Sequence, residues 1–115
     1  MKFSNNWFEQ NALPTWNVIF DQLQPKRCLE IGSYEGRAAA YLSTYPSVDT
    51  LICIDTWEGG LEHVSEDMGL IEQRFDENMS EVTKDLKHFL KLKGTSAMAL
   101  ANLYVADHKN FFDFI

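Results

Sequence analysis

The chain has 115 residues, 45% of them hydrophobic, which is enough for a single domain, residues 1–115, with one modest core. Its 17 acidic and 10 basic residues give a formal net charge of −7, and the lysines of segment 84–93 are interleaved with an acid and with leucines. Nucleic acids are bound by clustered Lys and Arg, so this class of partner is disfavoured. The sequence has no apolar signal region and no membrane-length apolar run, which predicts a cytoplasmic protein without a membrane partner.

The first half of the chain predicts two helices and two strands. Apolar residues recur at helical spacing within 14–24, and Pro25 ends this helix because proline disfavours helical geometry in the residue before it. A short strand is predicted at 27–31 and a helix at 38–45. Segment 50–54 is almost wholly apolar, which is typical of a parallel strand buried on both faces.

The second half continues the alternation of helices and strands. A loop at 56–65 precedes a helical stripe at 68–82, and alternating polarity at 88–93 predicts a half-exposed strand near a sheet edge. Another helical stripe at 100–104 precedes a predicted fourth strand at 111–115. The fold class is therefore α/β, with a Rossmann-like parallel sheet of about four strands and flanking helices.

Two cysteines, Cys28 and Cys53, lie inside the first two predicted strands. Buried free thiols behave as small hydrophobic side chains. Metal or redox pairs require closer spacing or neighbouring histidines, which neither cysteine has in the sequence. We interpret both as core residues and expect no metal site.

The glycine-containing run LEIGSYEGRAAAYL, at 29–42, joins the first strand to the next helix. Gly32 allows a ligand to approach the main chain or the turn to take a positive φ, and Gly36 allows the helix to pack against the strand it has just left. A dinucleotide fingerprint requires G-x-G-x-x-G. Tyr34 and Arg37 stand where its second and third glycines would be, which weakens a pyrophosphate site.

Acidic residues end the first two predicted strands. Glu30 would anchor a cation or polar donors and would repel a phosphate, whereas Asp55 would hold two ribose hydroxyls. A ligand with a ribose, a cationic amino-acid portion and no phosphate satisfies both, and S-adenosylmethionine is such a ligand. Structural alternatives remain open: Glu30 would pair with Arg27 or Arg37, and Asp55 would cap the turn before Trp57.

The run LEIGSYEGRAAAYL followed by ICIDTWEGG resembles the class I S-adenosylmethionine-dependent methyltransferases, and within them the small-molecule O-methyltransferase-like group. KLKGTSAMALANL and FFDFI are similar to that group's third strand, following turn and helix, and opening of the fourth strand. The resemblance covers 27–115 in patches. It implies methyl transfer from S-adenosylmethionine to a small-molecule hydroxyl or amine.

The resemblance implies roles for ten residues in cofactor binding. Glu30 would polarise the methionine end through nearby backbone or water, and Asp55 would hold the ribose hydroxyls. The others would line the glycine turn (Gly32, Ser33, Tyr34 and Gly36), flank the adenosine (Thr56 and Trp57) or lie near the adenine edge (Thr95 and Ser96).

In that family, three further strands follow the fourth and carry the substrate- or metal-binding residues. We therefore expect this chain to be the cofactor-binding part of such a domain, with its catalytic residues unassigned. His63 is either a general base near the site or a solvated loop residue, and Trp7 is either a pocket cover or core. Apolar segment 111–115 is expected to leave one edge unpaired, which favours either a longer chain or self-association through that strand.

Two further functions remain open. The first is a nicotinamide-dependent oxidoreductase, which the missing third glycine disfavours and which binding of NAD would support. The second is a catalytically silent module that binds nucleoside ligands or serves as a subunit. Methyl transfer depends mainly on alignment of the reactants, so the absence of an evident base in the sequence does not exclude activity.

Overall fold

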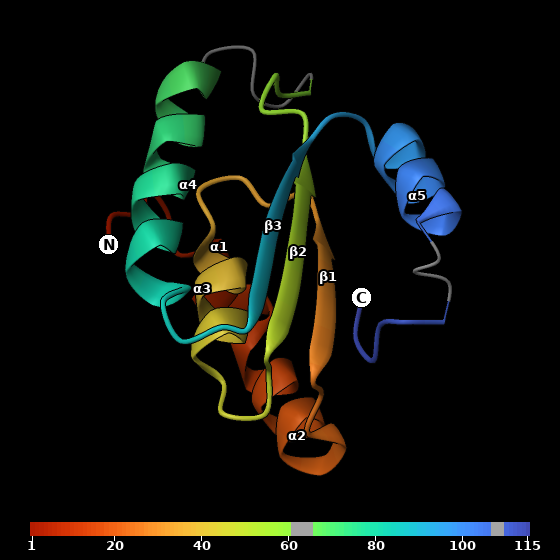
Figure 1. The fold of residues 1–115 in the computed structure, drawn as a ribbon. Helices are drawn as coiled ribbons and strands as arrows, with labels where there is room; N and C mark the ends of the chain where they lie inside the picture. Colours follow the sequence, from red (N-terminus) through yellow and green to blue (C-terminus); the bar gives the residue numbers. More distant parts are fainter. Residues whose placement is uncertain (61–65, 107–109) are drawn as a thin grey trace.

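A three-stranded parallel sheet lies at the centre of the molecule (Figure 1). The computed structural model describes residues 1–60, 66–106 and 110–115. The strands β1 (Arg27–Ile31), β2 (Thr50–Asp55) and β3 (His88–Lys93) are ordered β1-β2-β3, so β3 is at one side of this sheet, as its alternating polarity predicted. The predicted α/β class with a parallel sheet and flanking helices is confirmed, and it is compatible with a Rossmann-like fold.

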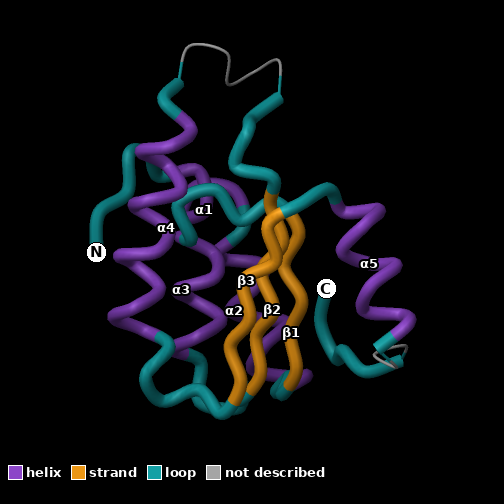
Figure 2. Tube along the Cα trace, turned by 45° about the horizontal axis from the view of Figure 1, so that its top comes forward, coloured by secondary structure: helices purple, strands orange, loops and turns teal. Residues whose placement is uncertain are grey.

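Helices cover both faces of the sheet, but unequally (Figures 1 and 2). Among the described residues, four helices lie on one face and one helix lies on the other. Burial of β2 between these layers explains its nearly continuous apolar sequence. The helices of the larger layer are α1 (Trp7–Asn11), α2 (Leu13–Leu23), α3 (Arg37–Thr44) and α4 (Met68–Val82), and the single helix is α5 (Ser96–Val105).

Two hydrophobic clusters fill the space on either side of the sheet. The larger cluster joins β1 and β2 to the four-helix layer and includes fully buried Phe20 and Phe75. The smaller cluster joins the other face to α5 through Ala99 and Leu103. Cys28 and Cys53 are buried free thiols of the larger cluster, which confirms their interpretation as core.

The predicted fourth strand is the principal error in the secondary structure. Segment 111–115 makes only an isolated parallel bridge, in which Phe114 pairs with Cys28 on the free side of β1. The Phe114 ring packs against α2, with its centroid 4.8 Å from that of Phe20 and 5.0 Å from that of Trp16. Phe112 packs against the α5 cluster, on the other face of the sheet.

The glycine turn between β1 and α3 uses its two glycines differently. Gly32 and Gly36 both have positive φ, at 85° and 83°. A Cβ at Gly32 would meet no atom within 4 Å, whereas a Cβ at Gly36 would lie 3.0 Å from the Phe75 ring and 3.2 Å from the Met79 sulfur. The close approach at Gly36 is therefore to α4, and not to the preceding strand as predicted.

This difference makes the two glycines a matched pair for measuring the packing against α4. Gly32→Ala should lower the free energy of unfolding by about 1–2 kcal/mol, because only the left-handed backbone penalises the new Cβ. Gly36→Ala should lower it by about 1–3 kcal/mol more, since Phe75 and Met79 must also move. Urea denaturation measures both values, and equal losses would show that α4 yields freely at this contact.

Candidate ligand-binding site at the carboxyl ends of the strands

Two adjoining cavities lie at the carboxyl ends of the strands. The larger has a volume of about 480 Å³ and the smaller about 170 Å³, and Gly32, Asp55 and Thr56 line both. The larger is also bordered by Trp7, Tyr34, Gly59, Gly60 and Met68, and the smaller by Ile31, Ile54, Gly94 and Ser96. Ligands of open parallel sheets bind at this end, so these cavities form the candidate site.

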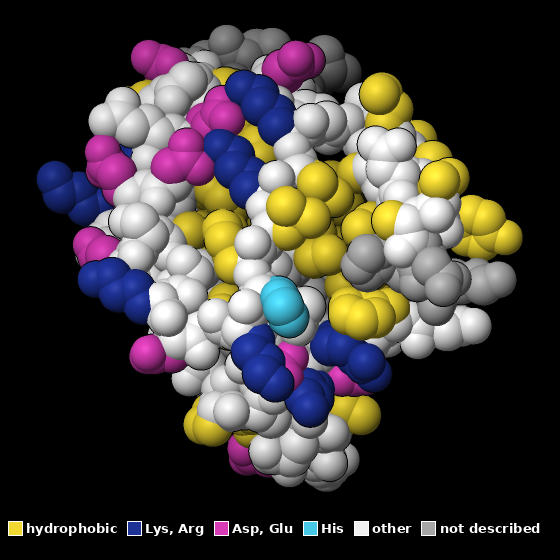
Figure 3. Space-filling model, in the orientation of Figure 1, with side chains coloured by type: hydrophobic (Ala, Val, Ile, Leu, Met, Phe, Trp, Pro, Cys, Tyr) yellow, Lys and Arg dark blue, Asp and Glu magenta, His cyan; other side chains and the backbone are white. Residues whose placement is uncertain are grey.

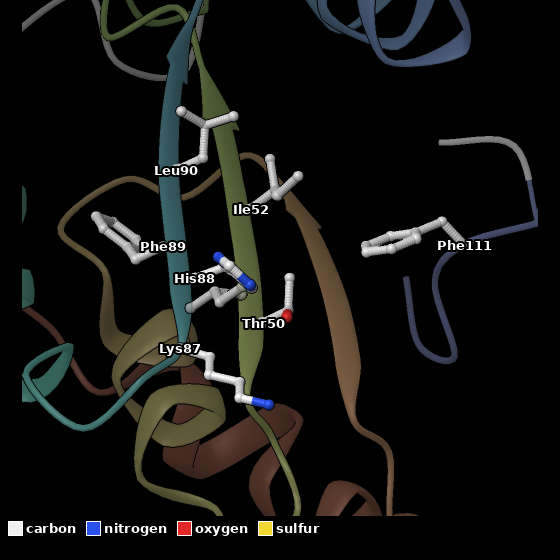
Figure 4. Close-up of a pocket in the computed structure, with 8 residues that line it drawn as sticks. Thr50, Ile52, Lys87, His88, Phe89, Leu90 and Phe111 are labelled. Atoms are coloured by element: carbon white, nitrogen blue, oxygen red, sulfur yellow. The ribbon is translucent and has the colours of Figure 1, made fainter. Parts of the chain in front are cut away.

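Another cavity of about 490 Å³ lies on the sheet face below α5 (Figure 4). Thr50 and His88 form one end of it, Ile52 and Leu90 form the other, and Phe111 faces them from the side. The same face in space-filling view shows hydrophobic side chains gathered between β3 and α5, above the histidine (Figure 3). None of the predicted site residues lines this cavity, and it is remote from the strand ends where the polar groups converge.

Glu30 has a buried carboxyl group that has no partner in the described part of the chain. Both of its carboxylate oxygens, and the Ser33 hydroxyl, are buried and make no hydrogen bond with the described residues. Arg27 pairs with Asp113 and Arg37 pairs with Glu9. The alternative that Glu30 forms an ion pair with one of these arginines is therefore wrong.

Burial changes the acidity of this group. Burial is the main reason that the pKa of Glu30 rises from its ordinary 4.5 to about 8, and the negative charge of Asp55 adds to the rise. The Ser33 hydroxyl, which is close but not in hydrogen-bonding geometry, acts in the opposite direction and lowers the pKa. Glu30 pairs in register with Cys53 and lies beneath the glycine turn, not among the residues that line the cavities. At neutral pH it is therefore mainly a neutral acid, which a nearby cation would ionise.

Asp55 joins two loops at the strand ends. Its Oδ2 accepts a hydrogen bond from the Tyr34 amide and its Oδ1 accepts one from the Trp57 amide, both at 2.9 Å. The structural alternative, that Asp55 caps the turn before Trp57, is confirmed, and the ribose role stays a prediction. Each carboxylate oxygen can accept more than one hydrogen bond, and Asp55 lines both cavities, so capping leaves acceptor capacity for a ligand.

Trp57 lies in the core and not on a cavity wall. Its side chain is 3% exposed, its ring packs 4.8 Å from that of Phe75, and the Lys91 ammonium lies 4.6 Å from its centroid. Its indole Nε1 donates to the Tyr34 carbonyl at 2.9 Å. In this structure Trp57 tethers the glycine turn, and the prediction that it flanks adenosine has no support from its position.

The remaining predicted residues divide by position. Tyr34 and Thr56 line the larger cavity and Ser96 lines the smaller, whereas Thr95 caps α5 by accepting from the Met98 amide at 3.2 Å. Gly36 is buried against α4, as described above. His63 lies outside the described residues. The described chain has no group of three or more His, Cys, Asp or Glu side chains that could hold a metal.

The sequence allows Trp7 to be either a pocket cover or a core residue, and in the structure it lies at the larger cavity. Its side chain is 52% exposed, and its ring centroid lies 5.8 Å from that of Tyr34. Trp16, by contrast, packs into the aromatic core. Met68, the first residue of α4, is only partly buried and lines the cavity. Contacts between residues far apart in sequence decide these positions, and periodicity carries no signal of them.

Comparisons with known protein families, with curated proteins and with solved structures found no match for this chain. None of the helices in the described part of the chain has the length and apolar character needed to cross a membrane.

Replacement of Glu30 should alter the pH dependence of stability. The folded state retains a proton on Glu30 up to about pH 8, whereas the unfolded chain loses it near pH 4.5. Between these values a rise in pH therefore lowers the free energy of unfolding, by up to about 1.4 kcal/mol per pH unit. Glu30→Gln removes this loss, so the variant should gain stability relative to the parent as pH rises toward 8. Parallel stability curves for the two proteins would show that Glu30 titrates normally.

Proposed function

We propose that this chain binds S-adenosylmethionine at the carboxyl ends of its strands and is the cofactor-binding part of a methyltransferase. The observation that carries the proposal is the buried, unpartnered Glu30 carboxyl beneath the open turn at Gly32, with Asp55 beside it. An unsatisfied buried carboxyl is costly unless a ligand or another function compensates. A ligand with a positively charged amine near the turn supplies that compensation.

The charge of the site favours an amine over a phosphate. A pyrophosphate on the α3 N-terminus would be repelled by the negative charge of Asp55, and it would offer no cation to stabilise an ionised Glu30. The described residues that line the two cavities include no Lys or Arg. An ammonium group above Gly32 instead attracts the ionised form of Glu30, and it needs no basic residue.

Asp55, the other acid at the strand ends, favours binding of a ribose next to that amine. Asp55 is rigidly held by two backbone amides and lines both cavities, so it can accept from hydroxyls without losing its cap. Thr56 and Ser96 border the smaller cavity beyond it, where an adenine edge would lie. The larger cavity, at about 480 Å³, is within the usual range for small-molecule sites.

The proposed reaction is transfer of the sulfonium methyl group to a small-molecule hydroxyl or amine. Attack of the acceptor lone pair on the methyl carbon forms the new bond, the carbon–sulfur bond breaks, and S-adenosylhomocysteine leaves. Such a displacement depends chiefly on holding the two reactants in line. The chain's own residues would bind and orient the methyl donor, and the acceptor-side base stays unassigned.

Glu30 gives the first test of this proposal, because binding of an ammonium should be linked to its proton. S-adenosylhomocysteine should bind more tightly as pH rises toward 8, with proton release that calorimetry detects as a dependence on the buffer's ionisation heat. Glu30→Gln should weaken binding and abolish this linkage. NAD serves as the competing ligand: binding of NAD without S-adenosylhomocysteine would favour the oxidoreductase alternative.

Asp55 gives the second test, with a capping aspartate as its control. Asp55→Ala should weaken S-adenosylhomocysteine binding by about 1–3 kcal/mol, because it removes a charged hydrogen-bond acceptor. It also removes two loop contacts, so stability must be measured alongside. Asp113→Ala removes a comparable carboxylate, which accepts from the Lys26 and Arg27 amides at 2.8 and 2.9 Å at the opposite end of β1 from the cavities, and should leave binding unchanged. Equal binding by the Asp55 variant and the parent would disprove the ribose contact.

A further inference from the structure

The N-terminal strap, defined as residues 1–11, is fixed across the glycine turn by buried polar contacts. The Ser4 amide donates to Glu35 Oε1 at 2.9 Å, and the Ser4 hydroxyl donates to the same oxygen. Glu35 is 2% exposed, and its other oxygen accepts from Arg74 Nη1 at 3.0 Å. The strap is thus tied both to the turn and to α4.

A second tie lies one turn along α4. Asn78 is buried and exchanges two hydrogen bonds with the Lys2 backbone, each at 2.8 Å. The Asn78 side-chain amide also donates to the Glu35 backbone carbonyl at 2.9 Å, which links the two ties. Phe8, 8% exposed, then anchors α1 in the aromatic core beside Trp16. Held at both ends, the strap leaves little freedom for Trp7.

These ties direct Trp7 to the larger cavity. While Phe8 is buried, the Trp7 side chain stays 52% exposed and lines the cavity with Tyr34, Gly32 and Asp55. A half-exposed tryptophan forgoes much of the stabilisation that apolar burial gives. Because buried polar groups nevertheless hold Trp7 at a cavity, its position suggests a contact with a ligand. Trp7 and Tyr34 thus line the same cavity as the turn that would receive the amine and the acid that would receive the ribose.

We propose that Trp7 is a ligand-contacting residue that recognises the sulfonium-bearing chain of the methyl donor, and that Glu35 and Asn78 are positioning residues acting through the strap. This inference rests on the proposed function. The portion of the ligand between its amine and its ribose carries the positive sulfur. Indole faces attract organic cations more strongly than other side-chain rings do, and the cavity offers no basic group among its described lining residues to oppose this attraction.

The charge of the sulfur provides the test, because S-adenosylmethionine and S-adenosylhomocysteine differ only in a methyl group and its positive charge. On the 115-residue chain, Trp7→Leu should weaken binding of S-adenosylmethionine by about three- to tenfold more than binding of S-adenosylhomocysteine. Trp7→Phe should fall between the parent and the Leu variant. Tyr104→Leu, an aromatic that is 65% exposed on α5, should change neither affinity.

The positioning role is tested by coupling. Ser4→Ala removes one strap contact and Glu35→Gln weakens the ion pair with Arg74, so each should lower the preference for S-adenosylmethionine over S-adenosylhomocysteine. In a Trp7→Leu background, Ser4→Ala should leave this preference unaltered, because its effect depends on the indole. A purely structural strap contact would change melting temperature without changing the preference.

The binding results distinguish failure of the Trp7 contact from failure of the proposed function. If the parent binds both ligands and folded Trp7→Leu binds them with unchanged preference, the Trp7 contact is wrong and the proposed function stands. If Ser4→Ala alters the preference equally with and without the indole, the positioning role is wrong. If the folded parent binds neither ligand at millimolar concentration, the proposed function fails and the sulfonium contact fails with it.

Discussion

The Asp55 carboxylate is the contact on which the candidate site depends. It accepts one backbone amide from the turn after β1 and another from the turn after β2, so a single side chain sets the separation of the two loops. The Trp57 indole completes the arrangement by donating to the Tyr34 carbonyl. Two loops that are distant in sequence thereby behave as one rigid rim at the carboxyl ends of the sheet.

This rim holds backbone conformations that the residues would not adopt alone. Tyr34 and Trp57 have φ values of 51° and 52°, in the left-handed region that non-glycine residues seldom occupy. Each such residue costs about 1 kcal/mol or more, and persists only where surrounding contacts outweigh the cost. The hydrogen bonds of Asp55 and the burial of Trp57 supply those contacts. Two of the four described non-glycine residues with positive φ therefore lie at this rim, where Gly32 leaves space above the main chain.

Local sequence patterns were sufficient for most of the fold and for part of the site. Alternating and continuous apolar runs predicted β1, β2 and β3 within a residue of their observed ends, because each strand's burial is set by its own side chains. Segment 111–115 has the same apolar character, yet it forms only a bridge, since pairing also depends on tertiary neighbours. Composition reports apolar character, not whether a partner is present.

Side-chain roles were harder to predict than elements. Sequence placed Glu30 and Asp55 at strand ends, but not the burial that leaves Glu30 unpaired or the amides that Asp55 caps. Glu35 gave no signal at all, because its partners are Ser4 and Arg74, 31 and 39 residues away. A buried carboxylate is identified by what surrounds it, and these surroundings come from three separate segments of the chain.

Glu30, just before the glycine turn, and Glu35, within it, both have buried carboxyl groups and show how environment divides their roles. Glu35 is satisfied by Ser4 and Arg74, so its charge is compensated within the protein and serves the architecture. Glu30, five residues earlier, has no such partner among residues 1–60, 66–106 and 110–115, and burial instead keeps it protonated at neutral pH. A neutral acid can remain buried without a counter-ion, although its unmade hydrogen bonds still cost free energy, whereas an ionised one requires a cation. The turn thus combines a carboxyl that is permanently compensated with one whose charge depends on what binds above it, and only the latter can couple ligand binding to proton release.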